Sequence, residues 1–229
     1  MKTIGLLGGM SWESTLDYYR IVNEVVAARL GGLHSAELVL HSVDFDRIER
    51  CQSAGDWGQA GEILGRTAQG LEAAGADFLV ICTNTMHKVA DQIQAHIRIP
   101  ILHIADVTAA ALKTADIREV ALLGTRHTMT QPFLKDRLAT AGLDVIVPDE
   151  AGVEQVNRII FDELCRGQLR DQSRAEILAV IDVLVGQGAQ GVVLGCTELP
   201  LLIKPEHCQV PVFDTTAIHA TAAAEFALA

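Results

Sequence analysis

A cysteine followed by two polar residues stands where a short apolar run of the sequence ends. Cys196, Thr197 and Glu198 come directly after residues 191–195, which are glycine, valine and leucine. A helix N-terminus lowers the pKa of a nearby thiol, and a thiolate can act as a base or a nucleophile. We therefore expect a lowered pKa and a role in proton transfer for Cys196. A buried, inert thiol is the alternative that this segment alone leaves open.

A second segment of the same pattern occurs earlier in the chain. Thr83, Asn84 and Thr85 follow the apolar run 78–81, with Cys82 between them. Residues 79–85 resemble residues 192–198 at an offset of 113, and residues 4–9 resemble residues 120–125 at an offset of 116. Two nearly equal offsets in the same order indicate two similar halves. If the halves pack symmetrically, the two polar segments would face one cleft.

Predicted strands and predicted helices alternate along the chain. Short runs rich in valine, isoleucine and leucine are typical of strands covered on both faces. They predict strands at 3–7, 37–42, 78–81, 101–104, 120–123, 144–146, 191–194 and 212–213. Helical periodicity predicts helices at 14–29, 57–73, 86–95, 128–141, 153–166 and 173–186. This alternation favours an α/β fold with mainly parallel sheets.

The first predicted strand leads into two glycines, Gly8 and Gly9, followed by Met10 and Ser11. Ligands of parallel sheets bind beyond the carboxyl ends of the strands. Free amides and hydroxyls in this loop would suit a carboxylate. A tight strand-to-helix turn is the alternative. The dinucleotide pattern G-x-G-x-x-G and the phosphate-loop pattern are both absent from the sequence.

Composition excludes several classes of protein. The chain has 229 residues, is 49% hydrophobic and carries a net charge of −11, which disfavours binding to nucleic acid or to an anionic membrane. No stretch of 18 apolar residues predicts a membrane span, and the first residues do not fit a signal peptide, so we expect a cytoplasmic protein. Five cysteines without a C-x-x-C pair disfavour a disulfide framework or a zinc site.

Four motifs carry a resemblance to the aspartate/glutamate racemase family. They are residues 5–15 (GLLGGMSWEST), residues 82–88 (CTNTMHK), residues 195–198 (GCTE) and residues 213–216 (FDTT). The resemblance implies two similar Rossmann-like domains, related by a pseudo-two-fold axis, with the active site in the interdomain cleft. It places the domains at 1–100 and 101–212, with a C-terminal helix at 213–229 returning to the first. It also implies activity without pyridoxal phosphate or any metal.

The resemblance further implies a mechanism of two-base proton transfer at Cα of aspartate or glutamate. One group removes the proton from one face while the other supplies a proton to the opposite face. Thr83 and Cys196 would be the catalytic pair. The substrate-binding residues implied are Met10, Gln52, Asn84, Thr85, Thr125, Thr197 and Glu198.

The sequence departs from the family pattern at the first catalytic position. The usual cysteine directly precedes the asparagine, where this chain has Thr83, and Cys82 lies one residue earlier. A shift of one residue along a strand turns a side chain to the opposite face, so Cys82 is not a simple substitute. Threonine is a poor base at neutral pH, so we expect an asymmetric enzyme. The broad aspartate/glutamate racemases of enteric bacteria are similar in having the same pair.

Two other functions stay open. A decarboxylase or isomerase that uses one thiol, similar to arylmalonate decarboxylase, would fit the single cysteine. A non-catalytic amino-acid-binding protein would fit the loss of the first cysteine. His87 and His219 are supporting candidates whose alternative is ordinary packing. We expect a small amino acid as the partner and a homodimer as the assembly.

Overall fold

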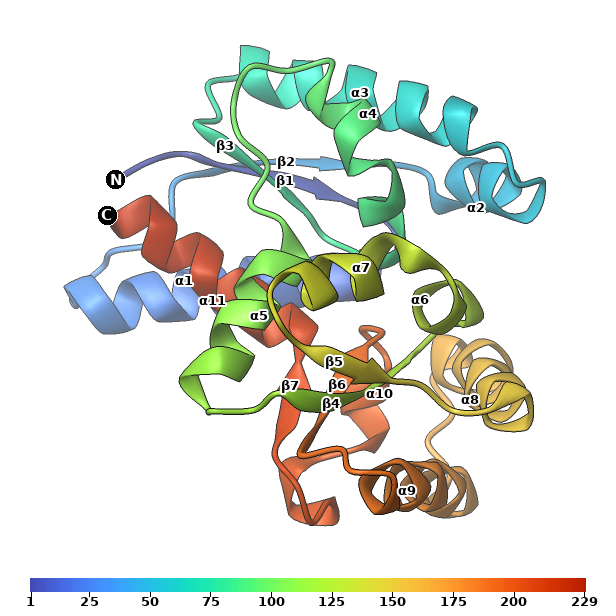
Figure 1. Cartoon of the computed structure of the whole chain (residues 1–229). Helices are drawn as coiled ribbons and strands as arrows, with labels where there is room; N and C mark the ends of the chain where they lie inside the picture. The colour runs from blue at the N-terminus through green and yellow to red at the C-terminus, as the bar shows by residue number, and fades with distance from the viewer. The chain divides into compact units, whose positions relative to one another are not determined.

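The computed structural model describes all 229 residues and divides into two compact units. The first unit consists of residues 1–104 and 216–229, and the second of residues 105–215. Each unit contains one parallel β-sheet with helices packed against it (Figure 1). The predicted α/β fold with parallel sheets is therefore confirmed. None of the helices combines the length and the apolar character that crossing a membrane requires.

The sheet of the first unit has three strands in the order β2-β1-β3. They are β1 (Ile4–Gly8), β2 (Leu38–Ser42) and β3 (Phe78–Ile81). Successive side chains of a strand point to opposite faces. Leu7 and Ile81 accordingly pack with Leu64 in one apolar cluster, whereas Leu6 and Val80 pack in another. Both faces of β1 and β3 are thus buried, which explains their unbroken apolar sequences.

Helices cover both faces of this sheet (Figure 1). On one side lie α3 (Trp57–Ala73), the one-turn η1 (Thr85–Val89) and α4 (Ala90–Gln94). On the other lie α1 (Trp12–Leu30) and α11 (Thr215–Leu228). The short α2 (Phe45–Ser53) was not predicted, because only one of its residues, Ile48, is fully buried. Its N-cap is Asp44, whose side chain accepts a hydrogen bond from the Asp46 amide at 3.3 Å.

The second unit contains a four-stranded sheet in the order β5-β4-β6-β7. The strands are β4 (Glu119–Gly124), β5 (Asp144–Ile146), β6 (Gly191–Gly195) and β7 (Val212–Asp214). Figure 1 shows α9 on the side of this sheet opposite to α5 and α7. The helical segments are α5 (Ile104–Thr114), α6 (Arg126–Thr130), α7 (Pro132–Thr140), α8 (Glu150–Asp162), η2 (Leu164–Arg166), α9 (Asp171–Gly186), α10 (Leu199–Leu202) and η3 (Pro205–His207).

The strand registers repeat between the two units. Leu7 of β1 lies opposite Ile81 of β3, and Leu123 of β4 lies opposite Leu194 of β6. These are the residues that the offsets of 116 and 113 relate to one another. Each unit therefore presents the carboxyl ends of two equivalent neighbouring strands at one edge of its sheet.

Four predicted elements differ from the structure in detail. The helix expected at 86–95 is η1 followed by α4, and the helix expected at 153–166 is α8 followed by η2. The strand expected at 101–104 is reduced to a single bridge between Ile101 and Leu79, because Ile104 already begins α5. The helix expected at 128–141 is two helices, because Gln131 is extended and Pro132 begins α7. Proline lacks an amide hydrogen and is suited to the first turn of a helix rather than its interior.

Candidate active site

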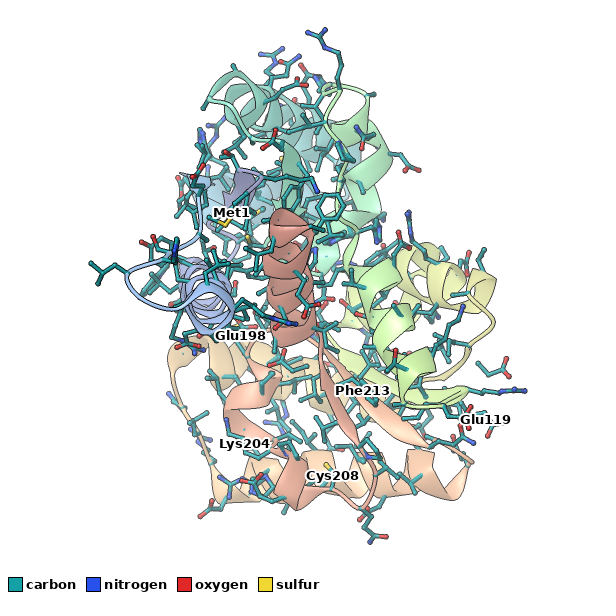
Figure 2. The ribbon with its side chains drawn as sticks, turned by 90° about the vertical axis from the view of Figure 1, so that its left-hand side faces the viewer. Met1, Glu119, Glu198, Lys204, Cys208 and Phe213 are labelled. Atoms are coloured by element: carbon teal, nitrogen blue, oxygen red, sulfur yellow. The ribbon has the colours of Figure 1, made fainter.

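The carboxyl end of β6 carries the first group of predicted site residues. Gly195 is paired with Gly124 of β4, so Cys196 and Thr125 leave neighbouring strands at the same edge of the sheet. A side chain at Gly195 has little room, since a Cβ there would lie 3.0 Å from the methyl carbon of Thr128. Figure 2 shows Glu198 and Glu119 at opposite ends of this sheet. The predicted residues of the second unit therefore gather at the edge where ligands of parallel sheets bind.

One carboxylate oxygen joins the three residues of this strand end. The thiol of Cys196 donates a hydrogen bond to Oε2 of Glu198, with 2.9 Å between Sγ and Oε2. The hydroxyl of Thr197 donates to the same oxygen at 2.8 Å. Cys196 is only 6% exposed, so this thiol and its acceptor meet where water competes weakly.

The thiol of Cys196 is protonated in this arrangement. Burial raises its pKa well above the ordinary value, and the negative charge of Glu198 raises it further. The lowered pKa expected from a helix N-terminus is wrong. The helix that follows, α10, has only four residues, so its dipole is small compared with burial and a neighbouring carboxylate.

The carboxyl end of β3 carries the second group. Cys82 occupies the position equivalent to Gly195, and its side chain packs with Tyr18 and Ala223 in the core beneath α1 and α11. It is fully buried, and burial alone raises the pKa of its thiol. Cys82 is therefore a core residue, and the position equivalent to Cys196 is that of Thr83.

Thr83, Asn84 and Thr85 form the turn from β3 into η1. Asn84 and Thr85 are buried, and Thr83 is half-buried. The backbone carbonyl of Asn84 accepts a hydrogen bond from the His87 amide at 3.1 Å. The carbonyl of Thr83 accepts one from Nδ1 of the same histidine at 2.8 Å. Backbone bonds to His87 therefore fix the turn.

The glycine loop after β1 is a tight structural turn. The Gly9 amide donates to the hydroxyl of Thr15 at 2.8 Å, and that hydroxyl donates to the carbonyl of Ser11 at 2.8 Å. Gly9 has a φ of +93°, and a Cβ there would lie 2.3 Å from the carbonyl oxygen of Val43. The expectation of free amides is thus wrong at Gly9, because the loop uses that amide to close on its own helix.

The other two predicted residues of the first unit, Met10 and Gln52, lie in different segments of the chain. Met10 is buried in the cluster that also holds Ile48 and Met86. Gln52 is half-buried on α2, one helical turn beyond Ile48 and on the same face. Through Ile48, α2 therefore packs in the same core cluster as Met10.

In the second unit, Thr125 is the N-cap of α6. Its side chain accepts from the Thr128 amide at 3.4 Å and lies 3.2 Å from the Thr128 hydroxyl. The next residue, Arg126, is held by Asn157 through its amide at 2.8 Å and by Glu150 and Glu154 through its guanidinium, both at 2.6 Å. The turn that bears Thr125 is therefore anchored to α8.

Sequence reasoning missed two members of a buried polar cluster in the first unit. Tyr18 donates to Nδ1 of His219 at 2.8 Å, and the ring of His103 lies 4.5 Å from the ring of His87 between centroids. A tyrosine on the apolar face of α1 and a histidine in an apolar segment carry no local signal. No group of three or more His, Cys, Asp or Glu side chains has the arrangement of a metal site.

Comparisons with known proteins agree with this arrangement. Residues 7–223 match the family model described as Asp/Glu/Hydantoin racemase. A Yersinia pestis protein provisionally assigned as an Asp/Glu racemase is 53% identical, with a TM-score of 0.96 and full coverage of both chains. An aspartate racemase homologue from Pyrococcus horikoshii is 37% identical, with a TM-score of 0.88 and full coverage of both chains.

A curated relative adds a described activity. The broad specificity amino-acid racemase of Bacillus subtilis is 24% identical over 147 residues, which are 64% of this chain and 63% of that protein. The family model covers nearly the whole chain, and it includes both strand ends described above. The chain therefore belongs to the Asp/Glu/hydantoin racemase family.

Proposed function

We propose that this chain is a racemase of acidic amino acids, aspartate or glutamate, that moves the proton at Cα with its own side chains. Cys196 and Thr83 are the two proton-transfer groups. Membership of the racemase family supports an isomerase, and the two equivalent strand ends supply one hydroxyl or thiol each.

The observation that carries the proposal is the hydrogen bond from Sγ of Cys196 to Oε2 of Glu198 at 2.9 Å. A protonated thiol can give its proton to a carbanion at Cα. To take a proton from Cα, the thiol must first pass its own proton to Glu198, the acceptor that it already contacts. Cys196 and Glu198 can therefore both donate a proton to Cα and remove one from it. Thr197 orients the Glu198 carboxylate through its hydrogen bond to the same oxygen.

Thr83 has no equivalent carboxylate. In place of the Cys196–Thr197–Glu198 sequence, the first unit has Thr83, Asn84 and Thr85. A hydroxyl gives or relays a proton but is a poor base without an activating partner. We propose that the exchange served by Thr83 is the slower one, so that the two enantiomers react unequally.

The proposed substrate contacts fall into two groups. In this proposal Asn84, Thr85, Thr125 and Thr197 bind the α-carboxylate, on which charge builds up in the transition state. Met10 and Gln52 contact the rest of the substrate. Gln52 is neutral, so its amide suits the distal carboxylate of either aspartate or glutamate without strict selection.

Exchange in heavy water tests the proposal. Each enantiomer of aspartate and glutamate is incubated with the protein, and loss of the Cα–H signal is followed by NMR. The wild-type protein should exchange at least one enantiomer, and Cys196→Ser should lower that rate by about 100-fold or more. Cys208→Ser is the matched control, because Cys208 is a half-buried thiol in the same unit. Undiminished exchange in Cys196→Ser would remove Cys196 from the mechanism.

A reaction that uses one thiol is the second candidate. It is favoured by one observation, that Cys82 is a core residue and leaves Cys196 as the thiol at these strand ends. Decarboxylation of a substituted malonate, in the absence of any Cα exchange with amino acids, would select this alternative. The homodimer and the cytoplasmic location stay predictions from the sequence, and sedimentation measures the first.

A further inference from the structure

The first unit contains a buried polar network that the proposed mechanism does not use. The three buried histidines of the chain, His87, His103 and His219, all lie in this unit. The His87 ring lies 4.5 Å from that of His103 and 5.6 Å from that of His219 between centroids. Three imidazoles in an apolar core are costly unless their nitrogens are hydrogen-bonded, so their partners indicate what they hold.

The partners of His87 fix its tautomer. Nδ1 lies 2.8 Å from the carbonyl oxygen of Thr83, which can only accept, so Nδ1 carries the hydrogen. Nε2 lies 3.2 Å from the amide of Ile104, which can only donate, so Nε2 accepts. His87 is therefore neutral. Protonation would set an N–H against the Ile104 amide. Burial and the two neighbouring histidines lower the pKa of His87 well below its usual value.

His219 has the opposite tautomer. Its Nε2 donates to the carbonyl oxygen of Leu102 at 2.7 Å, and its Nδ1 accepts from the hydroxyl of Tyr18 at 2.8 Å. Burial lowers the pKa of His219 to about 4, so it is neutral at physiological pH. Two neutral imidazoles thus hold Leu102 by its carbonyl and Ile104 by its amide.

The segment held in this way is where the chain leaves the first unit. Ile104 is the last residue of that unit and the first residue of α5. The amide of a first helical residue has no acceptor within its own helix, and Nε2 of His87 supplies one. His219 lies on α11, with which the chain returns to the same unit. The network therefore joins the Thr83 turn to the exit segment and the returning helix.

We propose that His87 is a positioning residue for Thr83. It holds the Thr83 carbonyl with one nitrogen and the first amide of α5 with the other, and His219, which is bonded to Tyr18, holds the same exit segment through the Leu102 carbonyl. This inference rests on the proposed role of Thr83 in catalysis. In the second unit, the position equivalent to His87 is Pro200, whose side chain forms no hydrogen bonds. This kind of positioning therefore serves only Thr83, the poorer of the two proposed proton-transfer groups.

The first test measures the tautomers of the wild-type protein by ¹⁵N NMR of its histidine rings and needs no activity. We expect His87 to be neutral with hydrogen on Nδ1, and His219 to be neutral with hydrogen on Nε2. We also expect the Ile104 amide to be protected from solvent exchange. A charged His87 at neutral pH, or hydrogen on its Nε2, would overturn the proposal even if no racemase activity were found.

The second test compares variants by Cα exchange with each enantiomer. His87→Leu should lower the rate of Cα exchange by about tenfold or more for the enantiomer whose exchange depends on Thr83. The exchange rate of the other enantiomer should change much less. His87→Asn, whose amide can still donate toward Thr83, should recover part of that rate. His34→Gln, at an exposed position of the same unit, is the control. Circular dichroism shows whether each variant folds.

The outcomes separate the inference from the proposed function. Equal slowing of both enantiomers by His87→Leu, or no recovery in a folded His87→Asn, would contradict a positioning role. If His87→Leu does not fold, the Asn variant and the tautomers still decide. If the wild-type protein exchanges no acidic amino acid, the proposed function fails, while the tautomers report separately on the network.

Discussion

The ends of strands β3 and β6 have equivalent registers with their neighbouring strands but different chemistry. Leu7 opposite Ile81 and Leu123 opposite Leu194 give the two ends one register. At β6, the half-buried carboxylate of Glu198 accepts hydrogen bonds from the thiol of Cys196 and the hydroxyl of Thr197. At β3, a neutral histidine holds the backbone of Thr83. The fold thus repeats the strand register, while the proton chemistry depends on the residues just beyond each strand.

We expect acid to destabilise the first unit more than the second, because all three buried histidines lie in the first unit. The pKa of His219 is about 4 in the folded protein against an ordinary value of 6.5, so the unfolded chain binds a proton that the folded chain does not. Stability is therefore full above pH 6.5 and falls by about 3 kcal/mol as the pH drops toward 4. Urea unfolding at a series of pH values measures this loss.

The matched variant is His219→Gln, which lacks the titrating ring. Its stability should fall less steeply over the same interval, and hydrogen exchange should show the acid sensitivity concentrated in the first unit. Identical pH dependence in the two proteins would show that His219 is not buried as a neutral group.

The second prediction concerns Glu198. Burial and the Glu198 charge both raise the pKa of Cys196, so Glu198→Gln should lower that pKa and make the thiolate appear at lower pH. Loss of the proton acceptor should also slow Cα exchange by about 100-fold. The pH dependence of Cys196 alkylation measures the thiol pKa. Alkylation of the Cys196→Ser variant gives the contribution of the other thiols, which is subtracted. Glu206→Gln, on the exposed η3 of the same unit, is the control, and an unchanged thiol pKa in Glu198→Gln would contradict the coupling.

A third prediction compares the equivalent positions 82 and 195. A methyl group at Gly195 would lie 3.0 Å from the Thr128 side chain and 3.1 Å from the Leu123 carbonyl oxygen. Gly195→Ala should therefore destabilise the protein by about 2 kcal/mol. Cys82→Ala, which only removes a buried sulfur, should cost about 1 kcal/mol and leave Cα exchange unchanged. Denaturant unfolding measures both, and a catalytic defect in Cys82→Ala would show that Cys82 takes part in the reaction.

Much of the fold could be predicted because buried parallel strands consist of short, continuous apolar runs that are visible in the sequence. The strands at 78–81 and 144–146 were predicted with their observed bounds. The strand predicted at 101–104 is wrong because only Ile101 pairs with β3 and Ile104 already begins a helix, whose first amide is held by His87, 17 residues earlier. A contact at that separation leaves no periodic signal in the sequence.

The candidate site was predictable where its contacts are local. Cys196, Thr197 and Glu198 are consecutive, so their grouping follows from the sequence, although the role of each stays a prediction. The direction of the Cys196 pKa was not predictable, because it depends on burial by residues from several elements. The bond between Tyr18 and His219 spans 201 residues of sequence and could be found only in the folded chain.

The decisive experiment replaces Thr83, the poorer of the two proposed proton-transfer groups, with cysteine. Thr83→Cys gives the first unit the thiol that its turn lacks while keeping His87 and the register of β3 unchanged. Cα exchange in heavy water should then rise by about tenfold for the slower enantiomer, with little change for the faster one. If the ratio of the two rates stays the same in a folded Thr83→Cys protein, the difference between the strand ends does not set the asymmetry, and the assignment of Thr83 is wrong.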